Sequence, residues 1–350
     1  MQDSGRSVGR LSLNHALKMV VFSFVVFTVA LLSDAPWKGF TQSRRVEFSA
    51  EPVRVASSLW RDGTFANPFA TPTGYTAHVA PGLPFLQSLV LRFVGGESGG
   101  WLIIRSLPSL ALSLQLALLP WLAIDLGYSA ETGSLASLLG LLVKPGLEEH
   151  WEAHLAGLAG LLLTAAACVW LRRERPLGWA IATGALAGLA IHLNPLLGMV
   201  YLLWVLSTGH SPGYFTRKVL PLWITPLLLM TPWTIRNLTV MRGLFPIRDD
   251  LGLELYVSYN DCAPYGFRES LKESCIQLLH PNSSMEEALA VRTLGEYEYN
   301  QIRFHKALLW IGSHPARTSS LTLQRIWFFW FPSESGIEGD LLPENSTDHN

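Results

Sequence analysis

The sequence alternates long apolar runs with polar stretches, and this pattern predicts a chain that crosses a lipid bilayer several times. The first apolar run extends from Met19 to Leu32 and follows a basic N-terminal stretch. Such a run fits either a signal peptide or a first transmembrane helix. We favour the helix, because the small-residue exit after Leu32 is followed by Pro36 and makes a poor cleavage site, and because many apolar segments follow.

Seven later segments predict further spans and bring the expected total to about eight transmembrane helices. They are Leu102–Ile124, Ser134–Leu147, Trp151–Leu171, Gly178–Ile191, Pro195–Leu206, Val219–Thr231 and a shorter one at Leu321–Phe331. Several fall short of the roughly 20 residues that cross the hydrocarbon core, so we expect some to tilt, thin the bilayer or enter it only in part. The predicted fold class is an all-α polytopic membrane protein.

The basic residues predict the orientation, since short loops rich in Lys and Arg stay in the cytoplasm. With the N-terminus inside, an alternating path also places Arg172–Arg175 and Arg217–Lys218 inside. The same path places two long polar segments on the outer face. The expected organisation is a cytoplasmic tail and first helix at 1–33, an outer loop with an amphipathic helix at 34–100, a transmembrane bundle at 101–235, an outer helical segment at 236–320, a short final span at 321–332 and a disordered tail at 333–350.

Composition supports a membrane location and excludes one class of partner. Of 350 residues, 49% are hydrophobic and only 15% are charged, which leaves too little polar surface for a soluble protein of this size. The 26 Lys and Arg balance 27 Asp and Glu, so no basic surplus exists to neutralise the phosphates of a nucleic acid. Cys262 and Cys275 flank a polar stretch, where an oxidising compartment would let them form a disulfide; two unpaired thiols are the alternative.

Acidic side chains in the first polar segment are candidates for chemistry at the membrane surface. Glu47 and Glu51 precede Arg54. A carboxylate here could take the proton of a hydroxyl acceptor, which is the task of a general base in glycosyl transfer. The simpler interpretation of either glutamate is a solvated surface side chain.

A second group of titratable residues lies at the start of the span predicted from Trp151. It consists of Glu148, Glu149, His150, Glu152 and His154. Three glutamates and two histidines at this spacing could bind a divalent cation, or they could only mark the boundary with water. Glu152 is the deepest of the acids in the predicted span.

An arginine follows the outer end of the span predicted from Val219. Arg236 could extend its guanidinium to lipid headgroups, or it could bind a phosphate through two parallel hydrogen bonds. A donor carried on a lipid phosphate would need the second arrangement.

The residues around Arg236 resemble a block of bacterial membrane glycosyltransferases of the GT-C type, in the superfamily of dolichyl-phosphate-mannose-protein mannosyltransferases and aminoarabinose transferases. This block is Trp233-Thr-Ile-Arg236-Asn237, Phe245-Pro246-Ile-Arg248 and Gly252-Leu-Glu254-Leu with Asn260. Other blocks follow in the family's order: Arg54-Val-Ala56, Gly63, Phe65, Pro68-Phe69, Gly74-Tyr-Thr-Ala-His78, Pro81, Trp151-Glu152, Asn194-Pro195, Gly295-Glu296-Tyr-Glu-Tyr299, Ala307, His314-Pro315 and Arg325. The resemblance covers most of the chain from about Glu47 to Trp330.

The resemblance implies a sugar donor on polyprenyl phosphate and inverting transfer to a hydroxyl of a lipid, glycan or protein, at the periplasmic face of a bacterial inner membrane. It implies that Glu51 is the acid near the reacting centre. The family's second acid is replaced by Pro52 here, so Glu47 is the alternative base.

The same resemblance assigns supporting roles. Arg236, with Arg54, would hold the donor phosphate, and Glu152 would assist at the site or coordinate a divalent cation. His78, Arg248 and His150 could line the site, although packing explains His78 equally well. Glu296 is expected to support the outer loop.

Two other functions stay open at this point. A transporter or flippase of lipid-linked precursors would need charged groups at mid-membrane and paired broken helices, and the sequence shows no internal repeat of that kind. A non-catalytic or truncated relative would bind the lipid-linked sugar without transferring it. Relatives usually continue with further spans after the position of Trp330, so a short or incomplete member of the family is expected.

Overall fold

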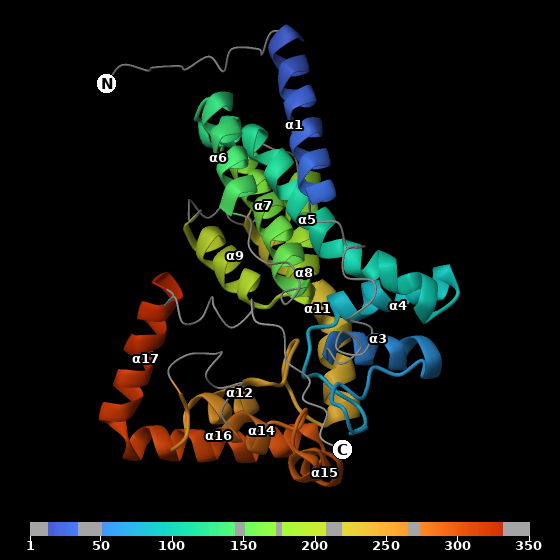
Figure 1. The fold of residues 1–350 in the computed structure, drawn as a ribbon, viewed down its shortest axis with the longest axis vertical. Coiled ribbons are helices and arrows are strands. Elements are labelled where there is room, and N and C mark those ends of the chain that lie inside the picture. Colours follow the sequence, from blue (N-terminus) through green and yellow to red (C-terminus); the bar gives the residue numbers. More distant parts are fainter. Residues whose placement is uncertain are drawn as a thin grey trace, which may run out of the picture. The chain divides into compact units, whose positions relative to one another are not determined.

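A computed structural model of the chain describes residues 13–33, 51–143, 151–172, 177–207, 219–264 and 274–331. Within these ranges the regular backbone is helical (Figure 1). The extended pairing there is limited to an antiparallel bridge between Ala66 and Tyr75. The predicted all-helical class is therefore confirmed for the described part of the chain. The chain divides into two compact units: unit 1 is Met1–Phe48 with Ala80–Ile235, and unit 2 is Ser49–Val79 with Arg236–Asn350.

Three of the described helices are long and apolar enough to cross a membrane, at Leu13–Ser33, Leu102–Leu126 and Glu152–Trp170. Shorter apolar helices occupy Gly82–Val94, Ala130–Val143, Leu177–Leu193 and Leu196–Ser207. The predicted count of about eight spans is not confirmed. The shorter helices are 12 to 17 residues long, below the roughly 20 that a helix needs to cross the hydrocarbon core unaided.

Unit 1 contains these apolar helices, and α5 is in contact with four of the others. The elements described in it are α1 (Leu13–Ser33), α4 (Gly82–Val94), α5 (Glu97–Leu126), α6 (Ala130–Val143), α7 (Trp151–Arg172), α8 (Leu177–Leu193), α9 (Leu196–Ser207) and α11 (Leu220–Arg236). Helix α5 packs against α1, α4, α6 and α7, and α8 packs against α7 and α9. The last residue of α11, Arg236, already belongs to unit 2.

Small residues let the helices of unit 1 approach one another closely. A Cβ on Gly133 of α6 would lie 2.5 Å from the Cα of Pro120 in α5, and one on Gly184 of α8 would lie 2.9 Å from the Cβ of Thr225 in α11. The buried hydroxyl of Ser137 donates to the carbonyl of Leu116 at 2.7 Å. Close backbone approach and short interhelical hydrogen bonds are how helices associate in lipid, where apolar surfaces gain little by meeting.

Unit 2 is polar and has its own core. The elements described in it are α3 (Glu51–Asp62), the short π-helix η2 (Asn237–Met241), α12 (Leu251–Ser258), α14 (Ser274–Leu279), α15 (Met285–Leu294), α16 (Glu296–Ser313) and α17 (Pro315–Trp330). Helix α16 packs against α12, α15 and α17. Phe69, Leu253, Val291 and Tyr299 form a buried apolar cluster.

Helices α12 and α16 meet almost backbone to backbone. A Cβ on Gly252 would lie 2.0 Å from the carbonyl oxygen of Asn300, so only glycine fits there. The side chain of Asn300 accepts from the amide of Leu253 at 3.0 Å and donates to the carbonyl of Asp249 at 2.6 Å. This contact fixes the segment that carries Arg248, Asp249 and Asp250.

The composition of unit 2 bears on topology. It joins residues from the first predicted outer segment, 49–79, to residues from the second, which begins at Arg236. The alternating path predicted from the basic residues also places these two segments on one face, and that path stays a prediction.

Candidate functional site

The first helix of unit 2 presents a carboxylate at its start. Helix α3 buries Val53, Val55 and Ala56, and Glu51 is the first residue of its first turn. The loop that follows folds back on itself: the amide of Asn67 donates to Gly74 O at 2.8 Å and that of Thr76 donates to Phe65 O at 3.2 Å. Gly74 has a φ of +94°, which favours glycine, and its amide donates to the side chain of Asn67. The fold-back precedes the segment that carries His78.

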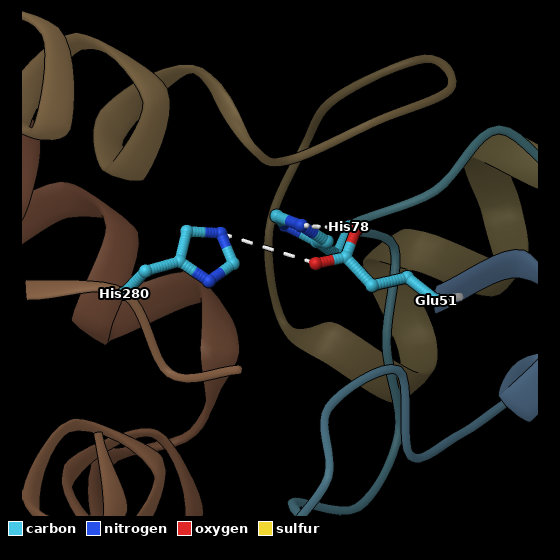
Figure 2. A group of neighbouring side chains, drawn as sticks. All are labelled: Glu51, His78 and His280. Atoms are coloured by element: carbon cyan, nitrogen blue, oxygen red, sulfur yellow. Dashed lines mark ion pairs between the residues drawn. The ribbon is translucent and has the colours of Figure 1, made fainter. Parts of the chain in front are cut away.

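Glu51, His78 and His280 form a compact group of side chains, which we call the Glu51 cluster (Figure 2). Oε2 of Glu51 lies 3.2 Å from Nε2 of His78, and Oε1 lies 3.9 Å from Nε2 of His280. Glu51 is 23% exposed, His280 is 16% exposed and His78 is 1% exposed. The ring of Phe69 packs against both imidazoles, with centroids at 4.9 Å from His78 and 5.8 Å from His280.

The backbone before His78 is held by a buried carboxylate from α16. Oε1 of Glu296 accepts from the amide of Ala77 at 2.6 Å, and Oε2 accepts from the hydroxyl of Thr76 at 2.5 Å. That hydroxyl in turn accepts from the amide of His78 at 3.0 Å. Burial raises the pKa of the Glu296 carboxyl, against the lowering effect of these hydrogen bonds and of His78. Glu296 therefore fixes the position of His78, which agrees with the loop-supporting role expected from the sequence.

Charge and burial act in opposite directions within the Glu51 cluster. Burial would raise the pKa of Glu51, but the positive charge and hydrogen bond of His78, aided by His280 and Arg248, lower it to about 2. Burial would lower the pKa of His78, but Glu51, with Glu296 and Asp250, raises it to about 9. For His280, burial outweighs the attraction of Glu51 and lowers the pKa to about 4. At neutral pH the cluster holds an anionic Glu51, a protonated His78 and a neutral His280.

Other acids lie close to the cluster. Burial, with the nearby charges of Glu296 and Asp250, raises the pKa of Asp249 to about 7. Burial also raises the pKa of Glu254. Arg248 donates to the carbonyl of His78 at 2.9 Å and pairs with Asp250 at 2.6 Å, so it links this acidic segment to the loop that carries His78.

The donor atoms of the Glu51 cluster fit a divalent cation. One carboxylate and two imidazoles offer ligand atoms that all lie within 4.8 Å of one another. Ligands about 2.1 Å from a tetrahedral Zn²⁺ are about 3.4 Å apart. Nε2 of His78 and Nε2 of His280 lie 3.2 and 3.9 Å from different oxygens of Glu51, so both imidazoles are near that spacing, and Nε2 of His78 must lose its proton before it binds the cation. Three protein ligands would leave a fourth position open, as in catalytic sites. One feature departs from the usual metal-binding histidine, because Nδ1 of His78 is buried and has no hydrogen-bond partner among the described residues.

The arginines predicted to bind phosphate are committed to loop contacts. Arg236 donates to the carbonyls of Thr76 at 2.8 Å and Phe65 at 3.0 Å. Arg54 donates to the carbonyl of Pro68 at 3.3 Å and makes a short hydrogen bond to the side chain of Asn282. Both guanidinium groups thus brace the 65–76 loop region, and any phosphate would share them with these carbonyls.

The remaining candidate acids and histidines lie in unit 1 or outside the described residues. Glu152 lies in α7, which belongs to unit 1. Glu47 and His150 lie outside the described residues, so the alternative base and the acidic turn before α7 stay predictions. Cys262 takes part in a disulfide and Cys168 has a reduced thiol, whereas the side chain of Cys275 is outside the described part.

Sequence reasoning missed His280. It follows α14 in a polar stretch, and no local pattern distinguishes it from other surface histidines. The adjoining Pro281 and Asn282 carry a weak signal, since Asn282 contacts Arg54. Only the packing of the two polar segments into one unit shows that His280 lies beside Glu51.

Comparisons with protein-family models, with curated proteins and with solved structures found no significant match to this chain.

Proposed function

We propose that this chain is a membrane glycosyltransferase that moves a sugar from a polyprenyl-phosphate donor to a hydroxyl acceptor, with the Glu51 cluster at its reactive centre. One observation carries the proposal: Glu51, the acid that the family resemblance implies, lies against two histidines within a unit built from both predicted outer segments. The candidate membrane spans of unit 1 support a donor that is presented from a bilayer.

The proposed reaction breaks the bond between the anomeric carbon and the phosphate oxygen, and the phosphate leaves with the electron pair. The acceptor oxygen bonds to the anomeric carbon from the opposite face, and the hydroxyl proton passes to Glu51. A pKa of about 2 makes Glu51 a weak base towards a free alcohol. An alcohol oxygen that has begun to bond to the anomeric carbon is a strong acid, however, so even this carboxylate can take its proton late in the reaction.

The two histidines have different tasks in this proposal. His78 is held by the backbone contacts of Thr76 and Glu296 and fixes one oxygen of Glu51 through its Nε2. The other oxygen points towards His280, whose neutral imidazole can accept or donate a hydrogen bond at the same place. A divalent cation would take the place of the proton on Nε2 of His78; held by Glu51, His78 and His280, it would supply Lewis-acid stabilisation to the phosphate leaving group.

Phosphate recognition is assigned to Arg236 and Arg54, as the resemblance implies. Burial lowers the pKa of both guanidinium groups from the ordinary value, yet each remains a cation at neutral pH. They would bind the phosphate while bracing the loop that precedes His78. Replacement of either arginine by lysine would keep the positive charge and remove the planar pair of hydrogen-bond donors. It therefore separates the contribution of the charge to phosphate binding from that of the donor geometry.

Transfer of labelled sugar tests the proposal. Vesicles that carry the full chain receive a panel of polyprenyl-phosphate sugars and membrane acceptors, and product is counted for wild type, His280→Ala and His305→Ala. His305 is an exposed histidine of α16 and serves as the matched control. We expect product from wild type and from His305→Ala, and a loss of about 100-fold or more for His280→Ala.

Three outcomes contradict the proposal in whole or in part. If wild type transfers no sugar from any donor, a non-catalytic relative explains the site better. If wild type carries the labelled donor across the bilayer without forming product, the chain is a flippase of lipid-linked precursors. Equal transfer rates for the two histidine variants would be consistent with a transferase but would show that the Glu51 cluster is not its reactive centre.

A further inference from the structure

Helix α17 has two unlike faces, and one of them is packed on unit 2. Leu321 is fully buried. The hydroxyl of Thr322 lies 2.9 Å from that of Tyr259, and Arg325 donates to the carbonyls of Ser258 at 2.8 Å and Pro264 at 3.0 Å. Residues 317, 321 and 325 recur every four positions and so form one stripe along the helix. This stripe fixes α17 to the end of α12.

The opposite stripe is apolar and exposed in the part of the chain that the structure describes. Leu323 is 66% exposed, Ile326 54%, Trp327 60% and Trp330 70%. Spacings of three and four residues place these side chains on one face of the helix. Phe329 and Phe331 are also exposed at the end of the helix. A soluble surface rarely leaves so many large apolar side chains together, and such a patch marks a binding surface.

We propose that the exposed stripe of α17 lies on the surface of a lipid bilayer, in the interfacial layer between headgroups and acyl chains. Its composition favours this occupant, because Trp and Phe have apolar rings that suit the acyl boundary and Trp adds an N–H for the headgroup region. The chain already has helices long and apolar enough to cross a membrane. If those helices cross a bilayer, they tether α17 to it, so the bilayer is present at a high effective concentration for α17. A separate partner protein has no such tether.

The stripe lies on the bilayer and does not cross it. From Ile326 to Phe331 the apolar end of the helix contains six residues, a length of about 9 Å against a hydrocarbon core of about 30 Å. The residues just before this end, Leu321 and Arg325, are committed to contacts within unit 2. This placement is an alternative to the short final span expected at 321–332, which stays a prediction. It rests on membrane attachment alone and does not depend on sugar transfer.

Site-specific fluorescence quenching tests this placement. The full chain carries Cys168→Ser, so that no native reduced thiol takes the label, and bimane is attached at Trp330→Cys or at Glu298→Cys. Glu298 is an exposed residue in the first turn of α16 and serves as the control. The parent with Cys168→Ser alone must take up no label. Each protein is reconstituted in vesicles of phosphatidylcholine and phosphatidylglycerol, with doxyl-labelled phosphatidylcholine or aqueous iodide as quencher.

We expect the label at 330 to lose fluorescence with doxyl lipid and to be protected from iodide, with the reverse at 298. A label at Leu323→Cys lies about two helical turns earlier on the same stripe and should behave like the label at 330. It replaces the label at 330 if Trp330→Cys does not fold. Quenching by iodide alone at 330 and 323 would show a water-exposed face and overturn the proposal. Protection from both quenchers would show that protein covers the stripe, a second copy of the chain included, and would overturn it equally.

Discussion

The two units of this chain bury polar groups in different ways. In unit 1 several buried hydroxyls bond locally or to a neighbouring backbone, as Ser113 does to Ser109 O and Ser137 does to Leu116 O. In unit 2 buried or half-buried charged side chains are linked across long stretches of sequence, as Glu296 is to Thr76 and Arg248 to His78. Small hydroxyls serve helix packing, whereas a connected set of charges holds specific atoms in place. The difference locates the candidate chemistry in unit 2.

The largest expected effect is on the contact that assembles unit 2. Gly252→Ala places a Cβ 2.0 Å from a backbone oxygen of α16, which cannot move without shifting the helix. We expect a loss of about 3 kcal/mol in the free energy of opening, measured by hydrogen exchange at the amide of Leu253. Gly178→Ala in α8 meets nothing within 4 Å and is the control in unit 1. Equal protection in both variants would show that the α12–α16 contact is loose.

The next effect separates positioning from stability. Glu296→Ala removes two hydrogen bonds and leaves the buried Ala77 amide without its acceptor, which costs about 2 kcal/mol. Because Glu296 holds the backbone of His78, we also expect Zn²⁺ affinity to fall by about 10- to 100-fold, measured by competition with a chromophoric chelator. Glu296→Gln keeps the shape and should lose less. Unchanged Zn²⁺ affinity in a destabilised Glu296→Ala would restrict Glu296 to a structural role.

The ion pair between Glu51 and His78 predicts a pH dependence for the metal-free protein. The pKa of Glu51 falls from 4.5 to about 2, so its stabilisation is present above pH 4.5 and is lost as the pH falls through 2. The pKa of His78 rises from 6.5 to about 9, so its stabilisation is complete below pH 6.5 and is lost as the pH rises through 9. Both shifts share one interaction.

Amide exchange of the segment before His78, with chelator present, should therefore be slowest between pH 4.5 and 6.5 once corrected for intrinsic rates. Above that range the opening free energy should fall by at most about 1.4 kcal/mol per pH unit. Within the optimal range two other groups oppose each other: the pKa of Asp249 is raised from 3.8 to about 7, so its contribution to stability falls as the pH rises, whereas the pKa of His280 is lowered from 6.5 to about 4, so its contribution grows. A Glu51→Gln variant with the same alkaline decline would show that the ion pair is not its source.

The smallest effect is expected in unit 1. Ser137→Ala removes a hydroxyl that donates to Leu116 O and Gly133 O, while both carbonyls keep the rest of their helical surroundings. We expect a loss of about 0.6 kcal/mol, measured by detergent unfolding of the reconstituted chain. A cost as large as that of Glu296→Ala would remove the contrast between the two units.

The helical class could be predicted from sequence because it depends on local hydrophobicity. Helix α7 begins at Trp151, where the apolar run predicted it. Helix α6 begins at Ala130 rather than Ser134, since the hydroxyl of Ser129 accepts from the amide of Thr132 and starts the helix earlier. Helix α11 continues to Arg236, past the predicted end at Thr231 and through Pro232. Boundaries of this kind depend on single capping contacts that hydropathy does not record.

The candidate site could be predicted only in part. Glu51 and His78 were named because a motif surrounds them, and Glu296 was expected to support the loop. His280 could not be found, because its role depends on contact with residues far away in the sequence. The predicted phosphate role of Arg236 took no account of the carbonyls of Phe65 and Thr76, which only the folded loop brings to its guanidinium.

The most direct test of the account compares two glutamates of unit 2 in the sugar-transfer assay. Glu51→Gln keeps the size of the side chain and removes the charge that pairs with His78 and His280, whereas Glu298→Gln removes an exposed charge outside the cluster. With both proteins inserted to the level of wild type, we predict that Glu51→Gln loses about 100-fold or more in initial rate and that Glu298→Gln transfers sugar like wild type. Equal rates for the two variants would contradict the central claim that the Glu51 cluster is the reactive centre.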